Sequence, residues 1–189
     1  MQKTNIIVIL TLALLDAAYC HFAWGKCPDV QLKATLDPVE YSGKWYEMYS
    51  GPLFKNVGQK CVTADYTLQT DSSIRVKNRA IKQDGTVGGI MGRATCRGAQ
   101  CRVKFDSLFI PYGPYEVLEA DYDSYAVVYT CSHYLFGVFR LQNIWILSRS
   151  TTLTGITSND ILTLINTKIP SYPTSILEVT EQGGSCTYA

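Results

Sequence analysis

The sequence predicts an all-β protein, an eight-stranded antiparallel up-and-down barrel with one C-terminal α-helix packed outside it. Three observations support this prediction: a succession of eight runs rich in β-branched and aromatic residues, turn-forming residues between most of them, and one later segment with helical periodicity. Closing the sheet removes exposed strand edges, and an eight-stranded barrel has an interior that can hold one small ligand. The alternative is an immunoglobulin-like sandwich, but the tryptophan positions do not fit it.

The chain opens with a segment typical of a secretory signal peptide. Lys3 supplies a positive charge, residues 5–18 form an apolar stretch, and small residues precede a cleavage site after Cys20. We therefore expect a signal peptide over residues 1–20 and one domain over residues 21–189. The apolar stretch is short for a membrane span, so a secreted, extracellular protein is expected.

Composition narrows the class of protein. With 47% hydrophobic and 17% charged residues the chain is globular, and a net charge of +1 argues against a nucleic-acid partner. Of the 7 cysteines, removal of Cys20 leaves an even number for disulfides in an oxidising compartment. The cysteines are widely spaced and the 2 histidines do not pair with them, so we expect no metal and no cofactor.

The elements follow one another in a simple order. Turn chemistry in QDGTVGG (83–89) and DYDS (121–124) separates neighbouring strands. Over residues 157–168 the spacing of the apolar residues becomes helical. Ser158 is a plausible N-cap for this predicted helix, and Pro170 follows its end. A short final strand is predicted over residues 175–182. The eight barrel strands are predicted at residues 43–50, 61–70, 73–82, 87–96, 101–108, 115–122, 124–132 and 143–150.

Three separated motifs resemble those of the lipocalin family. GKWYE (43–47) is similar to the Gly-X-Trp signature of the first strand. EADYDSYAVVY (119–129) is similar to the signature between the sixth and seventh strands, with Ala120 in place of the usual threonine. WILSRS (145–150) is similar to the third signature, and its arginine is Arg149. The resemblance runs from about Gly25 to Cys186. Within the family, the chain resembles the subgroup of apolipoprotein D, bilin-binding and crustacyanin-type lipocalins. The stretches that carry this similarity are GKCP, 103–131, LSRS and QGGSC.

This resemblance implies a closed base to the barrel. Gly43 would allow a tight passage of the chain, Trp45 would plug the base, and Arg149 would lie across its ring in a cation–π contact. These three residues are therefore expected to be structural.

The resemblance also implies two disulfides, Cys27–Cys131 and Cys61–Cys186. Cys96 and Cys101 flank RGAQ, a predicted hairpin between the fourth and fifth strands. They could face each other as a third disulfide or remain as two buried thiols.

Period-two alternation selects candidate ligand-binding residues. On the last barrel strand, Trp145 and Leu147 share the face of Arg149, and on the first strand Glu47 and Tyr49 share the face of Trp45. Glu47 would either bind a polar group of a ligand or have an internal partner. On the seventh strand the inward face is not fixed by the pattern, although a Cys131 disulfide favours Tyr125, Val127 and Tyr129 on the outside.

Three connections, 50–60, 108–114 and 132–142, should meet at the open end of the barrel, and they are unusually apolar. Such a rim is a candidate for contact with a lipid surface, a lipoprotein or another subunit, or for a lid over the opening. Its candidate residues are Leu53, Phe54, Phe109, Ile110, Tyr112, Tyr134, Leu135, Phe136, Val138 and Phe139.

These features favour a secreted carrier of a small hydrophobic ligand. The resemblance implies a bilin, carotenoid, retinoid, sterol or fatty acid and does not choose among them. The alternative is a pigment-binding subunit of an oligomeric assembly, homomeric or heteromeric, that uses the rim as its interface. An enzyme is not expected, because three disulfides would leave no thiol nucleophile in the mature chain.

Overall fold

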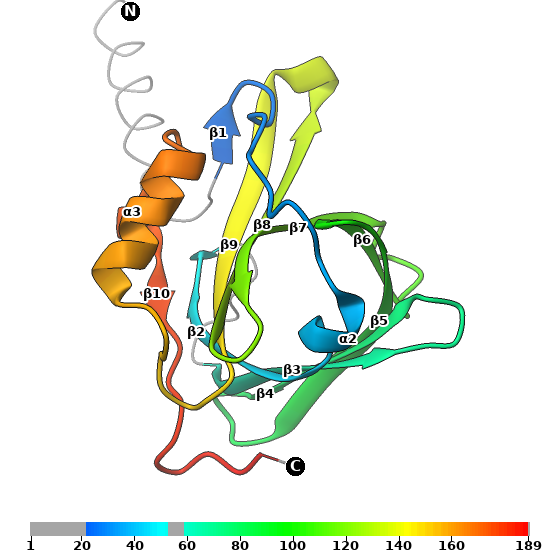
Figure 1. Ribbon diagram of the computed structural model, residues 1–189, viewed down its shortest axis with the longest axis vertical. Coiled ribbons are helices and arrows are strands. Elements are labelled where there is room, and N and C mark those ends of the chain that lie inside the picture. Colours follow the sequence, from blue (N-terminus) through cyan, green and yellow to red (C-terminus); the bar gives the residue numbers. More distant parts are fainter. Residues whose placement is uncertain (1–21, 53–58, 189) are drawn as a thin grey trace, which may run out of the picture.

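The computed structural model describes residues 22–52 and 59–188, which form the predicted closed barrel (Figure 1). Each strand pairs antiparallel with the next, and the last barrel strand pairs again with the first, which closes the sheet. The predicted signal peptide lies outside the described residues. The barrel strands are β2 (Gly43–Ser50), β3 (Lys60–Leu68), β4 (Ile74–Ile81), β5 (Val87–Arg97), β6 (Gln100–Phe105), β7 (Gly113–Asp121), β8 (Tyr125–Tyr134) and β9 (Phe139–Ser148).

Two short strands extend the barrel sheet. β1 (Phe22–Trp24) pairs with β9, a pairing that the sequence did not predict. β10 (Glu178–Val179) pairs with β2 and is far shorter than the predicted strand over 175–182. The reason is that the preceding residues form a 3₁₀ turn, η3 (Thr174–Ile176), which leaves two residues in register with β2.

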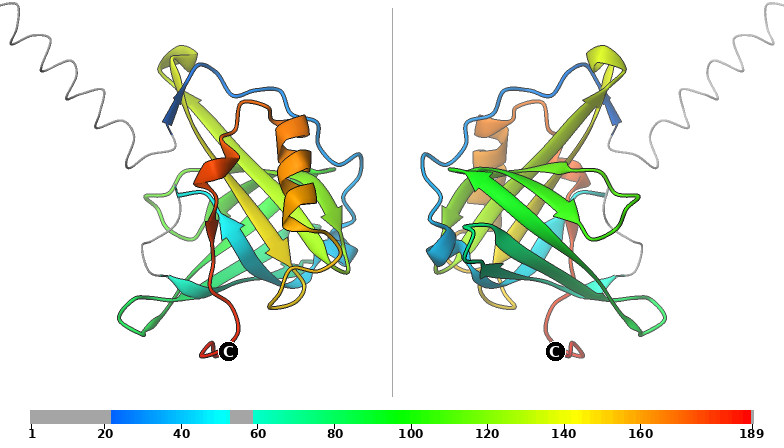
Figure 2. Two further views of the ribbon diagram at one scale, coloured as in Figure 1. Left: turned by 90° about the vertical axis from the view of Figure 1, so that its left-hand side faces the viewer. Right: turned by 90° about the vertical axis from the view of Figure 1, so that its right-hand side faces the viewer.

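The helix α3 (Ser158–Lys168) packs against the outside of the barrel, as predicted (Figures 1 and 2). Its N-cap is Thr157 rather than Ser158, because the Thr157 hydroxyl accepts a hydrogen bond from the Asp160 backbone N–H at 3.2 Å. The helix buries Ile161 and Ile165.

The apolar residues form two separate cores. One lines the barrel interior and includes Trp45, Ala126 and Val128. The other lies between the barrel wall and α3 and includes Val127 and Tyr129. Alternate residues of β8 therefore belong to different cores, which settles the face that the sequence left open: Val127 and Tyr129 face outward.

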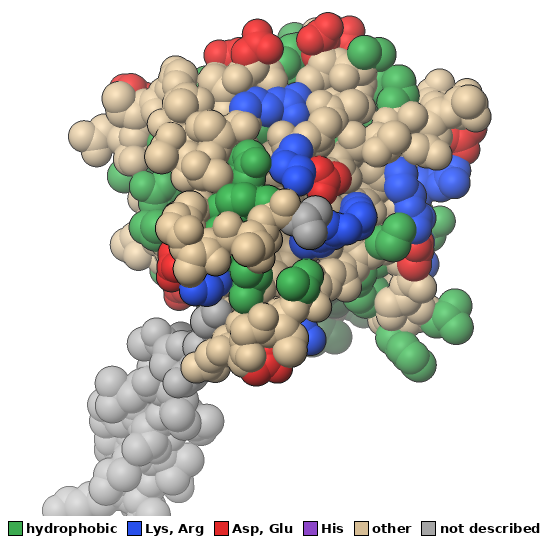
Figure 3. All heavy atoms as spheres, turned by 90° about the horizontal axis from the view of Figure 1, so that it is seen from below, with side chains coloured by type: hydrophobic (Ala, Val, Ile, Leu, Met, Phe, Trp, Pro, Cys, Tyr) green, Lys and Arg blue, Asp and Glu red, His purple; other side chains and the backbone are tan. Residues whose placement is uncertain are grey.

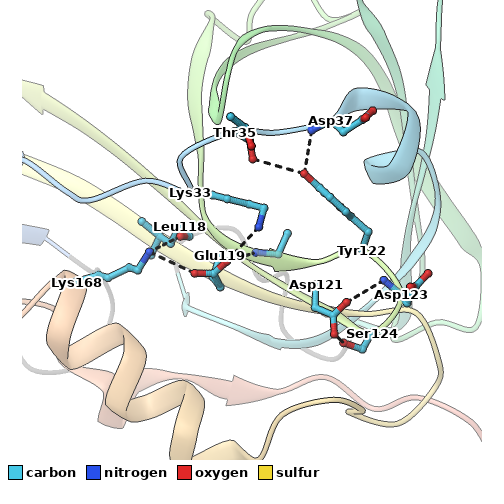
Figure 4. Close-up of polar contacts among 11 residues, drawn as sticks. Lys33, Thr35, Asp37, Leu118, Glu119, Asp121, Tyr122, Asp123, Ser124 and Lys168 are labelled. Atoms are coloured by element: carbon cyan, nitrogen blue, oxygen red, sulfur yellow. Dashed lines mark hydrogen bonds and ion pairs between the residues drawn. The ribbon is translucent and has the colours of Figure 1, made fainter.

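A polar network at the barrel wall ties three distant segments together (Figure 4). Glu119 of β7 lies between two lysines: its carboxylate oxygens are 3.4 Å from Lys33 Nζ and 3.7 Å from Lys168 Nζ. Lys168, at the last turn of α3, also donates to the Leu118 carbonyl at 2.5 Å. Lys33 precedes the barrel in sequence, so this network fixes both the entering chain and the helix on β7.

Three disulfides are present in the described residues: Cys27–Cys131, Cys61–Cys186 and Cys96–Cys101. The first two are the pairs that the resemblance implied. In the third, the two cysteines are directly opposite each other in the β5–β6 register, which confirms the bridged alternative.

The surface carries both signs of charge. On the face seen in Figure 3, Lys and Arg side chains lie among Asp and Glu side chains. On the outer wall, for example, Arg75 pairs with Asp106 and Arg93 with Asp71, each at 2.6 Å. Within the described part of the chain, every helix is too short or too polar to cross a membrane.

Candidate functional site

The barrel interior contains a cavity of about 830 Å³ that opens between the strand connections at one end. Its walls are mostly apolar, with contributions from Val76, Val103 and Leu147. A volume of this size is within the range of small-molecule sites. Among the described residues, no group of three or more His, Cys, Asp or Glu side chains is arranged to hold a metal ion.

Trp45 packs in the inner core, next to the cavity-lining residue Tyr41. Its side chain is fully buried, and its Nε1–H donates to the Tyr41 carbonyl at 2.9 Å. Tyr41 belongs to the short helix α2 (Pro38–Tyr41), which lies across the barrel end in Figure 1. Asp37 caps α2 by accepting hydrogen bonds from two backbone N–H groups, and this positions the turn over the base.

Arg149 covers Trp45 from outside the cavity. The guanidinium carbon is 3.7 Å from the centroid of the Trp45 ring, so the predicted cation–π contact is present. The charge is further stabilised by four backbone carbonyls. The guanidinium donates to the carbonyls of Tyr122 at 2.7 Å, Lys44 at 3.0 Å, Glu40 at 2.7 Å and Ser42 at 2.9 Å.

Gly43 explains how the chain passes beneath this guanidinium. Its φ is 101°, in the region that favours glycine, and a Cβ there would be 3.2 Å from Arg149 Nη1. Glycine is therefore favoured at this position for two reasons. Other residues rarely adopt this positive φ, and a side chain here would crowd the Arg149 guanidinium.

Three tyrosines line the inner part of the cavity. The Tyr115 hydroxyl is 2.7 Å from that of Tyr41 and 3.0 Å from that of Tyr66. Burial raises the pKa of Tyr66 to about 12 and raises the pKa values of Tyr41 and Tyr115 well above their ordinary value. All three phenols are therefore neutral at physiological pH.

Three of the four predicted ligand-binding residues line the cavity: Trp145, Leu147 and Glu47. The Trp145 ring lies nearly parallel to that of Tyr115, with centroids 6.5 Å apart. The Glu47 carboxylate accepts a hydrogen bond from the Thr180 hydroxyl at 2.7 Å. Of the two alternatives for Glu47, an internal partner is therefore the one observed.

The expectation that Tyr49 faces the cavity is wrong. A β-bulge shifts the β2–β9 register between Glu47 and Tyr49, so the alternation of faces is broken at Met48. Tyr49 instead packs in the outer core, and its hydroxyl is 3.1 Å from that of Ser158 at the start of α3.

Period-two reasoning missed several polar residues of the cavity. On β3, Tyr66 shares its face with Ala64, and this alternation was visible in the sequence. Asn78 also lines the cavity, and its buried Oδ1 atom has no hydrogen-bond partner among the described residues. Tyr41, by contrast, precedes the first barrel strand, and no strand pattern places it beside Tyr115.

The rim residues divide into two groups. Ile110, Tyr112 and Tyr134 contribute to the cavity mouth. Leu135 and Phe136, at the projecting β8–β9 tip in Figure 2, are 66% and 102% exposed, and Phe109 is 96% exposed. Val138 is also exposed.

The remaining predicted rim residues are not observed as exposed side chains. Phe139 stacks with the rings of Phe22 and Tyr134 and is half-buried rather than free. Leu53 and Phe54 lie outside the described residues.

Comparison with known proteins identifies the family. The lipocalin-like domain family matches residues 36–182, and the chain belongs to this family. It is 37% identical to apolipoprotein D of Oryctolagus cuniculus over 178 residues, which cover 89% of this chain and 93% of that one.

Solved structures show the same fold. Insecticyanin from the tobacco hornworm Manduca sexta superposes with a TM-score of 0.75 at 23% identity, covering 86% of this chain and 89% of that chain. Lobster apocrustacyanin A1 superposes with a TM-score of 0.68 at 23% identity, covering 85% and 96%.

Proposed function

We propose that this protein is a secreted carrier that binds one small hydrophobic ligand inside the barrel. The observation that carries the proposal is the cavity itself, which has a volume of about 830 Å³, lies inside the barrel and has mostly apolar walls. Membership of the lipocalin family and the similarity to apolipoprotein D support a binding role. The candidate ligand classes are bilins, carotenoids, retinoids, sterols and fatty acids.

Secretion and a non-enzymatic role are part of this proposal. Every cysteine in the described residues is in a disulfide, which suits an oxidising compartment. The same pairing leaves no thiol nucleophile among those residues. The proposed signal peptide over residues 1–20 would direct the domain over 21–189 out of the cell.

Fluorescence titration tests the proposal. Trp145 lines the cavity, whereas Trp24 on β1 is 72% exposed and outside it. Ligands from the five classes should quench the parent and the matched control Trp24→Phe, while Trp145→Phe should lose a large part of the quenching amplitude. Equal amplitudes in the two variants would remove Trp145 from the site, and absence of binding in the parent would contradict the carrier function.

A second candidate function is that of a subunit in a coloured or lipid-associated assembly. The exposed apolar tip formed by Leu135 and Phe136 favours it, because such side chains usually mark a contact surface. Sedimentation of the parent with and without ligand distinguishes a monomeric carrier from a subunit that assembles.

A further inference from the structure

The hydroxyl groups of the three cavity tyrosines have three protons but form only two hydrogen bonds with one another. Tyr41 and Tyr66 each bond to Tyr115, so three hydroxyls share two hydrogen bonds. Each hydroxyl has one proton, and each bond uses one. Whichever way the two bonds run, one proton is left, and within residues 22–52 and 59–188 the three hydroxyls form no further hydrogen bond.

This remaining donor is held inside the cavity. Tyr41 and Tyr66 are 2% and 7% exposed, and all three side chains line the cavity wall. Buried hydroxyls are rarely left without a partner, because an unsatisfied one costs about 1–3 kcal/mol. The inner end of the cavity is therefore suited to a molecule that brings a hydrogen-bond acceptor to it.

The charges of the cavity define which acceptor fits. The Glu47 carboxylate lines the same cavity and contributes to raising the pKa of Tyr66, so a neutral acceptor avoids the repulsion that a second carboxylate would meet there. Among the described residues of the lining, the cationic ones are Arg79 and Lys82. Lys82 follows the last residue of β4, whereas Tyr66 is paired with Val76 near its start. Six residues at about 3.3 Å each place Lys82 roughly 20 Å along the strand from the level of Tyr66.

We propose that the tyrosine cluster is a subsite for a neutral acceptor, such as a ketone or aldehyde oxygen, at the inner end of an elongated apolar ligand. A carboxylate, where the ligand has one, points outward to Lys82. This inference rests on the proposed carrier function and adds the chemistry and the orientation of the ligand.

A matched pair of ligands tests the proposal. Hexadecanoic acid and 15-oxohexadecanoic acid share a carboxylate, and the second has a ketone near the opposite end. The parent should bind the keto acid about 2- to 12-fold more tightly, the effect of one net hydrogen bond. The triple variant Tyr41→Phe/Tyr66→Phe/Tyr115→Phe should lose this preference, while the control Tyr112→Phe/Tyr134→Phe, changed at the mouth, should retain it.

Single variants and spectroscopy sharpen the test. Tyr66→Phe leaves two hydroxyls, one bond and one spare proton, so it should keep the preference. Lys82→Gln should weaken both acids equally, with Lys77→Gln on β4 as its control. In the parent, the ketone infrared band of the bound, isotope-labelled keto acid should lie at a hydrogen-bonded frequency, a readout that does not depend on the folding of any variant.

The outcomes separate this inference from the carrier function. Binding of both acids without preference in the parent, or an unshifted ketone band, overturns the inference and leaves the carrier function standing. A preference that survives in a folded triple variant also overturns it. Failure of the parent to bind any ligand overturns both.

Discussion

Replacing Arg149 by alanine should destabilise the protein without changing which ligands it prefers. The guanidinium makes four hydrogen bonds to backbone carbonyls and covers the Trp45 ring at 3.7 Å. Net contributions of about 0.5–1.5 kcal/mol per bond give roughly 2–6 kcal/mol, and the cation–π contact adds about 0.5–2 kcal/mol. Water can reach several of the freed carbonyls at the barrel end, so we expect a net loss of about 2–4 kcal/mol in the free energy of unfolding.

Urea unfolding followed by circular dichroism measures this loss, and a titration with the five ligand classes measures selectivity. Arg149→Lys is the matched control: it keeps the charge but cannot present five donors in a planar fork, so it should recover less than half of the loss. A variant as stable as the parent, or a stable variant with a changed ligand preference, would refute the structural role.

Three further predictions follow from the same geometry. Gly43→Ala should destabilise the fold by about 1–2 kcal/mol, because alanine is strained at a φ of 101°; thermal unfolding measures it, and a neutral effect would contradict the tight passage. Stability should fall as the pH rises from 10.0 toward about 12, because burial raises the pKa of Tyr66 and the unfolded chain loses that proton first; urea unfolding across this range should show a smaller fall for Tyr66→Phe, and equal falls would argue against it. Leu135→Ser/Phe136→Ser should reduce co-sedimentation with lipid vesicles, since each buried apolar side chain contributes roughly 1.5–3 kcal/mol. Attachment of the parent should withstand moderate salt, and equal sedimentation of both proteins would exclude the tip as the contact.

The barrel could be predicted because each strand carries its own local signal. Alternation in β9 put Trp145 and Leu147 on the face of Arg149, and the lipocalin resemblance assigned that face and Trp45 to the interior before any pairing was known. The β-bulge at Met48 could not be read in this way, because it depends on how β2 pairs with β9, and it reversed the direction of Tyr49.

The inner polar subsite was less accessible to sequence reasoning. Tyr41, Tyr66 and Tyr115 come from α2, β3 and β7, and their contact depends on the closed barrel and on the helical turn across its end. Likewise, β1 pairs with β9 across more than a hundred residues, and its three residues contain no pattern that predicts this.

Native mass spectrometry of the protein purified from its source, without removal of lipid, tests the central claim most directly. We expect a complex of one chain with one small apolar molecule, which is released when the barrel is unfolded and rebinds to the refolded parent. The mass of the polypeptide alone, combined with no binding of any of the five ligand classes, would contradict it.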